Sequence, residues 1–401
     1  MQPAARLLDV TRLARRAGRV LTGVDRVELA YLRALLDRAE PVFGLTRTRL
    51  GYVLLDRQGL SGFSQRLTGA VDWGATDRLS AVMRGMEEQQ KRVESDLRRL
   101  ALARCLPPRL ARMLATHLPK GSAYLNVGHS NLTDRVLFAV KHGAGMRIAV
   151  MIHDTIPLDF PQTQRPETKG AFREMLKRVR AKADLILCNS DQTRADVVRH
   201  MQAWGSVPDQ LVAHLGADLA QGEPVSVATA PYFVTVGTIE PRKNHALLLE
   251  LWEEMAKGAD CPQLVICGAR GWRNEAFLAR LDASPLLGDR ILECPDLTDG
   301  QITALLQGSC GLLFPSLAEG YGLPPIEAAA LGVPVVCNDL PVYREILGDI
   351  PVYAGIEDRY LWLRTIRGMM QAPRADGQTD AAQRFTPPTW QQHFNAVLRL
   401  T

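Results

Sequence analysis

Residues 314–334 read FPSLAEGYGLPPIEAAALGVP, and no other stretch of the chain says as much about its fold. The pattern predicts a strand that ends at Phe314, followed by a turn in which Gly320 and Gly322 let backbone amides approach a ligand. Pro324 and Pro325 pre-set the φ angle for the start of a helix. Unpaired N–H groups and partial positive charge gather at a helix N-terminus. The stretch therefore predicts a phosphate site made by the backbone.

Two carboxylates flank this turn, Glu319 before the glycines and Glu327 in the first part of the helix. A phosphate repels a carboxylate, so these two side chains are better suited to accept hydrogen bonds from sugar hydroxyls on either side of the phosphate. The alternative for each one alone is structural: Glu327 would favour the helix dipole, and Glu319 would be solvated.

Length and composition indicate a two-domain globular protein. The 401 residues exceed one ordinary core, and 46% are hydrophobic and 23% charged. Apolar runs such as residues 148–152 are far shorter than a membrane span, and the first residues, MQPAARLLDV, lack the core of a signal peptide. We therefore expect a cytoplasmic protein, with peripheral attachment to the inner face of the plasma membrane as an open alternative.

No metal or disulfide pattern stands in the sequence. The seven cysteines form no Cys-x-x-Cys pair, and the histidines form no His-Glu-x-x-His motif. No two aspartates stand two apart, so an Asp-x-Asp clamp for a metal diphosphate is missing. The sequence predicts no metal site and a reducing compartment.

Short aliphatic runs alternate with amphipathic helical stretches, which predicts an α/β fold of two doubly wound, Rossmann-like domains facing across a cleft. The Pro-bounded stretch QGEPVSVATAP (221–231) reads as a linker. We expect domains at 1–222 and 223–385, with a basic helical insertion near 78–118. A C-terminal helix in 386–401 is expected to return to the first domain.

Several first-domain residues are candidates as well. The segment IHDTIP ends a predicted strand and turns His153 and Asp154 toward the expected cleft. A single histidine at a strand end is more often structural, and Asp154 would either orient His153 or meet an acceptor hydroxyl. TGVD at 22–25 fits a helix capping box, and Gly23 is also placed to approach a phosphate.

The chain resembles a known family at these motifs. The spacing of Glu319 and Glu327 within EGYGLPPIEA is similar to the paired-glutamate signature of the family 4 (group 1) retaining glycosyltransferases, which have the GT-B architecture. Bacterial O-antigen and capsule mannosyltransferase-like enzymes are the members it resembles. Further similar segments are GTIEPRKNH (237–245), GARGW (268–272), IHD (152–154), CNSDQT (188–193), and LLDVTRL with TGVDRV near the start.

The resemblance implies roles for individual residues. Glu319 would lie beside the donor sugar, Glu327 would hold the nucleotide ribose, and His153 would contact the sugar or its leaving group. Family members usually have an Arg where this chain has Thr238, so Arg242 beside Lys243 would supply the guanidinium instead. The catalytic candidates are thus His153, Glu319, Lys243 and Arg242, and the nucleotide-binding candidates are Gly23, Thr238, Gly268, Leu297, Gly320, Tyr321, Gly322, Leu323 and Glu327.

The implied activity is a retaining, metal-independent glycosyltransferase, a hexosyltransferase of cell-surface polysaccharide synthesis. The donor would be a nucleotide-diphosphate sugar, GDP-mannose in preference to a UDP-sugar, and the acceptor a saccharide or lipid-linked saccharide. The alternative is a catalytically silent binder of sugar nucleotides or polyanions with the same fold. A nicotinamide enzyme is disfavoured because Leu-Pro-Pro follows Gly-Tyr-Gly, and we expect no nucleic-acid partner.

Charge is unevenly distributed. Residues 1–222 hold 34 Lys and Arg against 22 Asp and Glu, whereas residues 223–401 hold 14 against 21. The basic run from Arg84 to Arg112 suggests an anionic membrane surface as a partner of the first domain, with a solvated helix face as the alternative.

Overall fold

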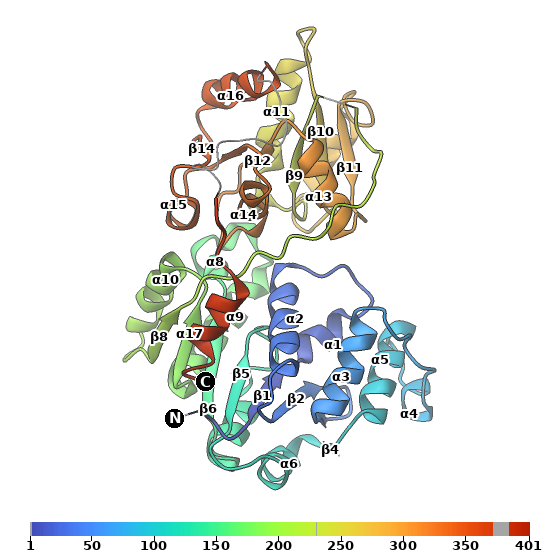
Figure 1. The fold of residues 1–401 in the computed structure, drawn as a ribbon, viewed down its shortest axis with the longest axis vertical. Helices are drawn as coiled ribbons and strands as arrows, with labels where there is room; N and C mark the ends of the chain where they lie inside the picture. Colours follow the sequence, from blue (N-terminus) through green and yellow to red (C-terminus); the bar gives the residue numbers. More distant parts are fainter. Residues whose placement is uncertain (1, 230, 372–384) are drawn as a thin grey trace.

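The computed structural model describes residues 2–229, 231–371 and 385–401, and it contains two lobes, each built around one β-sheet (Figure 1). The first lobe has an eight-stranded sheet and the second a six-stranded sheet. Both sheets carry helices on both faces. The predicted α/β class with two doubly wound sheets is confirmed.

The first sheet has the strand order β4-β3-β2-β1-β5-β6-β7-β8 and is parallel except at β2–β3 and β3–β4. The chain adds strands on one side of β1 and then crosses to its other side with β5, so the topological switch point lies between β1 and β5. The strands are β1 (Arg6–Asp9), β2 (Val42–Arg47), β3 (Tyr52–Leu55), β4 (Ala103–Cys105), β5 (Ala123–Asn126), β6 (Arg147–Ile152), β7 (Leu185–Cys188) and β8 (Asp209–Val212).

The second sheet is parallel throughout, with the order β11-β10-β9-β12-β13-β14. Its switch point lies between β9 and β12, where the order of addition reverses. The strands are β9 (Tyr232–Val236), β10 (Gln263–Cys267), β11 (Ile291–Cys294), β12 (Leu312–Phe314), β13 (Val335–Cys337) and β14 (Val352–Tyr353). The loops that follow β9 and β12 therefore lie side by side at the carboxyl edge of the sheet.

Helices cover both faces because alternate strand residues point to opposite sides. Phe233 and Leu264 pack under α11, α12 and α16, whereas Val234 and Val265 pack with α13, α14 and α15. These helices, with the short η4, are η4 (Pro241–Lys243), α11 (His245–Met255), α12 (Glu275–Asp282), α13 (Asp299–Gly308), α14 (Leu323–Ala330), α15 (Pro341–Leu347) and α16 (Arg359–Gln371).

The first lobe follows the same rule, with buried residues of α1, α2, α3, α5 and α17 on one face and of α6, α7, α9 and α10 on the other. Its helical segments are α1 (Thr11–Arg16), α2 (Gly23–Leu36), α3 (Arg57–Leu67), α4 (Arg78–Ala81), α5 (Glu88–Arg99), η1 (Pro107–Arg109), α6 (Leu110–His117), α7 (Asp134–Phe138), η2 (Ala139–Gly143), α8 (Ile156–Asp159), η3 (Pro161–Thr163), α9 (Pro166–Lys182), α10 (Asp191–Gln202) and α17 (Trp390–Val397).

Segment 78–118 differs from the expected helical insertion. It contains the edge strand β4, which pairs with β3, and helix α5 buries Val93 and Leu97 in the core of the first lobe. Arg98 is not a free basic residue either, because its side chain is only 6% exposed and pairs with Asp77 at 2.8 Å. The segment is thus built into the lobe, and part of its positive charge is neutralised there.

Helix α17 lies on the first lobe, although it follows the second lobe in the chain (Figure 1). The Tyr31 hydroxyl of α2 lies 2.7 Å from Nε2 of His393. The Nδ1 atom of His393 lies 3.1 Å from the His214 carbonyl, so Nδ1 donates and Nε2 accepts from Tyr31. Residues 372–384, which precede the expected domain boundary, lie outside the described residues, as does residue 230 of the expected linker.

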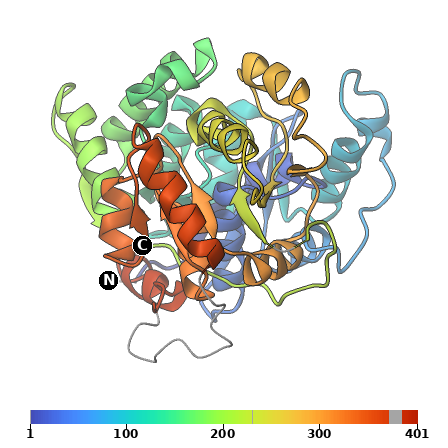
Figure 2. The same ribbon diagram turned by 90° about the horizontal axis from the view of Figure 1, so that it is seen from above.

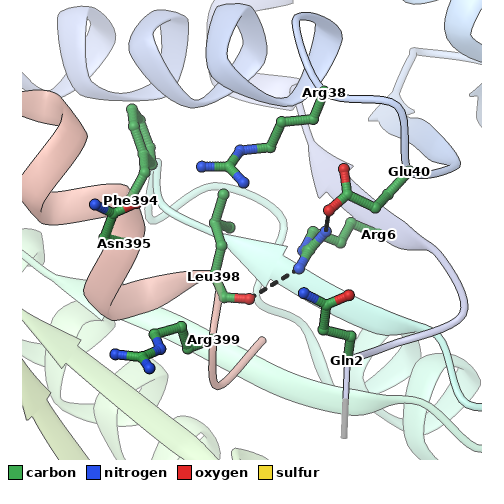
Figure 3. Close-up of a pocket in the computed structure, with 8 residues that line it drawn as sticks. All are labelled: Gln2, Arg6, Arg38, Glu40, Phe394, Asn395, Leu398 and Arg399. Carbon is green, nitrogen blue, oxygen red and sulfur yellow. Dashed lines mark hydrogen bonds and ion pairs between the residues drawn. The ribbon is translucent and has the colours of Figure 1, made fainter.

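The chain that follows α17 is fixed by a buried arginine of β1. The Arg6 guanidinium donates to the carbonyls of Leu398 and Thr401, both at 2.9 Å. These carbonyls lie at the end of the helix, where backbone acceptors lack partners within the helix. A cavity of about 320 Å³ lies beside this contact, and Arg6, Arg38, Glu40 and Arg399 are among the residues that line it (Figure 3). The first and last described segments lie side by side in both views (Figures 1 and 2).

Among the described residues, no helix combines the length and the apolar character needed to cross a bilayer.

The buried His393 makes stability depend on pH. Burial lowers the pKa of His393, and hydrogen bonds to the His214 and Ala213 carbonyls raise it. Burial has the larger effect, so the pKa is about 4. An unfolded histidine titrates near 6.5, so between these two values the unfolded chain binds a proton that the folded chain does not, and the free energy of unfolding falls as the pH falls. From pH 7.5 to pH 5 this one group should remove about 2 kcal/mol.

Urea unfolding of the wild type and of His393→Gln at pH 7.5 and pH 5 measures this contribution. The variant should lose less stability than the wild type over that interval. Equal losses would show that His393 does not titrate in this way. Other buried histidines are present in both proteins, so their contributions to the change in unfolding free energy cancel in the comparison.

Candidate functional site

The two loops at the switch point of the second sheet bring the predicted basic and acidic residues together. Lys243 and Arg242 follow β9, and Glu319 follows β12. The Nζ atom of Lys243 lies 2.7 Å from Oε1 of Glu319, and Nη1 of Arg242 lies 2.7 Å from Oε2. Both carboxylate oxygens are thus paired. Ligands of open parallel sheets bind at this edge, so the cluster stands where a substrate is expected.

Burial and ion pairing shift the pKa of the Glu319 carboxyl in opposite directions. Burial raises the pKa of its carboxyl, but Arg242 and then Lys243 lower it, and together they bring the pKa to about 2. Glu319 is therefore ionised at neutral pH. A carboxylate held in this way can accept hydrogen bonds but has no proton to donate.

The Arg242 guanidinium contacts three groups of the protein through Nη1 and Nη2. Besides Glu319 it contacts Oε1 of Glu240 at 2.6 Å and donates to the Ala318 carbonyl at 2.8 Å. Arg242 belongs to the loop after β9 and thus connects this loop to Ala318 and Glu319 of the loop after β12. Thr238 lies in the same loop, where Gly237 packs so closely on Gly268 that a Cβ on Gly268 would stand 2.1 Å from the Gly237 carbonyl oxygen.

The glycine turn after Glu319 touches the first lobe directly. A Cβ on Gly320 would lie 2.0 Å from the His153 carbonyl oxygen, so this position has room only for glycine. The Gly320 carbonyl accepts from the hydroxyls of Ser190 and Thr193, both at 3.1 Å. Ser190 also caps α10 by accepting from the Thr193 amide at 3.0 Å.

The rest of the turn leads into α14. Gly322 has a φ of +88°, which favours glycine, and it precedes the first helical residue Leu323. Pro324 and Pro325 therefore occupy the first turn, where no backbone N–H is needed. The helix thus starts at Leu323, directly before the two prolines that were expected to set its start. The Tyr321 hydroxyl donates to the Leu215 carbonyl at 2.7 Å and forms a second contact between the lobes.

An arginine of the first lobe pairs with Glu327 on α14. The Nη2 atom of Arg26 on α2 lies 2.6 Å from Oε1 of Glu327. The start of α2 faces the start of α14, since a Cβ on Gly23 would lie 3.9 Å from Cδ1 of Leu323. The sequence did not single out Arg26; its only signal was its place in the motif TGVDRV.

The capping box at the start of α2 is present. The Asp25 carboxylate accepts from the Thr22 amide at 2.7 Å, and Arg12 contacts Asp25 at 2.6 Å. Arg16 adds a second ion pair to Asp25 at 3.3 Å. These contacts fix the helix end that carries Gly23.

His153 lies at the expected strand end but does not extend into the cleft. The residue is 5% exposed, and its Nε2 atom lies 2.6 Å from the Val127 carbonyl. Burial lowers its pKa to about 4, so the ring is neutral at pH 7. The ring of His129 lies beside it at 5.0 Å between centroids. The expected cleft-facing position is therefore corrected: the ring packs inside the first lobe because the Val127 carbonyl takes its donor.

Asp154 does not hydrogen-bond to the His153 ring in the described part of the chain. Its carboxylate accepts from the Ile156 amide at 3.0 Å, and burial raises its pKa. Asp154 lines a cavity of about 330 Å³ between the lobes, together with Phe160, Glu319 and Gly320. Carboxylates beside an apolar wall suit a neutral polyhydroxyl ligand better than a phosphate.

The remaining predicted residue, Leu297, is partly buried against the core of the second lobe, next to the capping residue Thr298 of α13. Within residues 2–229, 231–371 and 385–401, no group of three or more His, Cys, Asp or Glu side chains is arranged to hold a metal ion.

One known protein family matches a segment that includes most of the second lobe. Residues 220–350 match the family described as "Glycosyl transferases group 1". The serotype-specific mannosyltransferase WbdA of Escherichia coli is 33% identical over 221 residues, which cover 51% of this chain and 27% of WbdA. The O-antigen chain mannosyltransferase RfbU of Salmonella typhimurium is 28% identical over 157 residues, covering 38% of this chain and 41% of RfbU. The chain thus spans less than half the length of these relatives.

Solved structures resemble the whole chain. Anabaena Alr3699/HepE, crystallised with UDP-glucose, has a TM-score of 0.61 at 14% identity and covers 98% of this chain and 94% of its own. Sucrose-phosphate synthase of Thermosynechococcus elongatus has a TM-score of 0.58 at 15% identity, and the match covers 91% of this chain and 89% of the synthase chain. At these identities the likeness concerns the fold.

The matched segment 220–350 contains both loops of the switch point and the turn between Glu319 and Glu327. The paired sheets give the chain the two-lobed arrangement of the GT-B glycosyltransferases. The chain therefore carries a glycosyl transferases group 1 domain within a GT-B fold.

Proposed function

We propose that the chain is a retaining hexosyltransferase that moves a sugar from a nucleoside-diphosphate sugar to a saccharide or lipid-linked acceptor without a metal ion. One observation carries the proposal. Glu319 and Glu327 stand on the two sides of one glycine turn, each held by a basic side chain, where the carboxyl edge of the second sheet meets the first lobe. This placement suits two sets of sugar hydroxyls with a diphosphate between them.

In this proposal Glu319 accepts from hydroxyls of the donor sugar, and Glu327 from the ribose. Backbone amides of residues 320–323, at the start of α14, bind the diphosphate. Lys243, whose Nζ lies 2.7 Å from Glu319, supplies positive charge beside the sugar phosphate bond. Gly23, Thr238, Gly268 and Leu297 are proposed to form the surrounding walls of the nucleotide site.

The proposed step is a displacement on one face of the sugar. The acceptor oxygen forms a bond to the anomeric carbon as the bond from that carbon to the phosphate oxygen breaks. The acceptor proton passes to the leaving phosphate oxygen, so no protein base is needed. His153, neutral and bonded to Val127, is proposed to shape the wall of the site through its backbone contact with Gly320. The protein contributes positioning and charge stabilisation.

The names of WbdA and RfbU as mannosyltransferases support GDP-mannose as the donor, and the name of RfbU as an O-antigen chain enzyme supports cell-surface polysaccharide synthesis as the process. A silent binder of sugar nucleotides is the competing function. Release of free nucleoside diphosphate from GDP-mannose or a UDP-sugar in the presence of acceptor distinguishes the two, because a binder releases none.

Lys243→Ala should lower kcat by about a hundredfold or more, since removal of one donor to the developing charge costs a few kcal/mol. Steady-state kinetics of nucleoside diphosphate release measures the effect, and circular dichroism checks the fold. Lys257→Ala is the matched control, because Lys257 lies on the exposed surface and pairs only with Glu254 among the described residues. Full activity in Lys243→Ala would remove Lys243 from the site.

Activity should persist in about 5 mM EDTA, because the proposed charge partners of the diphosphate are Lys243 and backbone amides rather than a cation held by carboxylates. The rate is measured with and without chelator, and again after addition of magnesium. Loss of activity with EDTA and its return with magnesium would contradict the metal-free step.

We also propose that the first lobe meets an anionic membrane surface. On the edge strand β4 and its flanks, Leu102, Arg104 and Leu106 point outward, with exposed fractions of 42% and 62% for the two leucines. Arg109 and Arg112 follow on the same surface segment. Exposed leucines between arginines suit a lipid interface, where apolar groups enter the bilayer surface and cations meet phosphate.

The triple variant Arg104→Glu/Arg109→Glu/Arg112→Glu should sediment less with phosphatidylglycerol vesicles than the wild type while it still turns over the donor. The measurement is made at about 10 mM salt, where charges act over about 30 Å. Arg364→Glu/Arg367→Glu on α16 is the control on the other lobe, with two charge reversals against three. Absence of wild-type binding at this salt would exclude the membrane contact.

A further inference from the structure

The cation that would meet the diphosphate is the open question at this site. The family pattern places an Arg where this chain has Thr238, and Arg242 was the expected substitute. The structure commits the Arg242 guanidinium to Glu319, Glu240 and the Ala318 carbonyl. Withdrawing it would leave the buried Glu319 and Glu240 carboxylates without their guanidinium, which is costly. Arg242 is therefore poorly placed to change partners during a catalytic cycle.

Arg26 has the opposite character. Its side chain is 28% exposed, and only Nη2 makes a hydrogen bond to another described residue, the contact with Glu327 at 2.6 Å. Nε and Nη1 are thus available for a further acceptor. The Glu327 side chain is only 14% exposed, so breaking the pair requires a new partner for its carboxylate, which the ribose hydroxyls of a bound nucleotide supply.

Arg26 also stands at the right place. It lies in the first turn of α2, three residues after Gly23, and the start of α2 faces the start of α14. The proposed diphosphate site lies at the start of α14, and the proposed ribose ligand Glu327 is the group that Arg26 holds. A nucleotide that enters therefore presents both a new partner for Glu327, the ribose hydroxyls, and a new partner for Arg26, the phosphates.

We infer that Arg26 is a diphosphate ligand that changes partners, pairing with Glu327 in the free protein and with the phosphates of a nucleoside diphosphate when the ribose takes Glu327. This inference rests on the proposed function. It adds a cation of the first lobe to Lys243 and the backbone amides of the second lobe, so that the full set of phosphate partners is assembled only when the two lobes are together. No proton or covalent bond changes in the exchange; one ion pair replaces another.

The exchange predicts a selective binding defect. Arg26→Ala should weaken binding of GDP or UDP, whichever the wild type binds, by about tenfold or more. Binding of the matching nucleoside should be unchanged or slightly tighter, because Glu327 no longer has a competing partner. Glu327→Gln gives the contrast: it should weaken the nucleoside, and weaken the nucleoside diphosphate by a smaller factor, because Arg26 no longer has a competing carboxylate partner. Calorimetry measures the diphosphates, and ligand-observed NMR measures the weaker nucleosides.

Arg26→Lys separates charge from mere packing, since lysine keeps the positive charge and should retain part of the diphosphate affinity. Arg33→Ala, on the exposed side of the same helix, is the control and should bind like the wild type. Thermal unfolding confirms that each variant is folded.

Three outcomes would overturn the inference. An equal loss for nucleoside and diphosphate in Arg26→Ala would mean that Arg26 only orients Glu327. No loss for either would mean that the ion pair only joins the lobes. A wild-type protein that binds neither GDP nor UDP would contradict the proposed function itself, and the partner exchange would fall with it.

Discussion

The buried carboxylate of Glu319, clamped between Arg242 and Lys243, is the interaction on which the site depends. A carboxylate out of water is stable only when it is paired, so the loop after β12 must stay against the loop after β9. This fixes the glycine turn at the carboxyl edge of the second sheet. From there Gly320 reaches the His153 backbone, Tyr321 reaches Leu215, and α14 starts at Leu323. One electrostatic requirement thus positions the turn, the helix start and the contact with the first lobe.

Several contacts between the lobes are made by polar groups. Ser190 and Thr193 donate to the Gly320 carbonyl, and Arg26 pairs with Glu327. Glu345 of α15 accepts from the first amides of α10 and lies 2.8 Å from His214. Polar contacts of this kind can be exchanged for water or ligand at modest cost, whereas an apolar interface cannot. The arrangement is consistent with lobes that adjust to a ligand held between them.

Helix α17 gives the first lobe a different kind of support. It packs on α2 through Tyr31, His393 and Phe394, and Arg6 binds the carbonyls that end it. The helix that carries Gly23 and Arg26 therefore has the last helix of the chain at its back. Rigid packing behind a binding helix keeps its start in place while the polar groups in front of it change partners.

Local patterns in the sequence were enough for the α/β class with two doubly wound sheets, for the strand that ends at Phe314 and for the helix that follows the turn at 320–322, because each depends on neighbouring residues. They did not predict β1, because its buried Arg6 is stable only where the carbonyls after α17 accept its hydrogen bonds. They also did not predict the ion pair with Asp77 that neutralises Arg98. They placed His153 in the cleft, whereas the Val127 carbonyl holds it inside the lobe. Arg26 and Glu327 are 301 residues apart, and only the packing of the two lobes brings their charges within 2.6 Å.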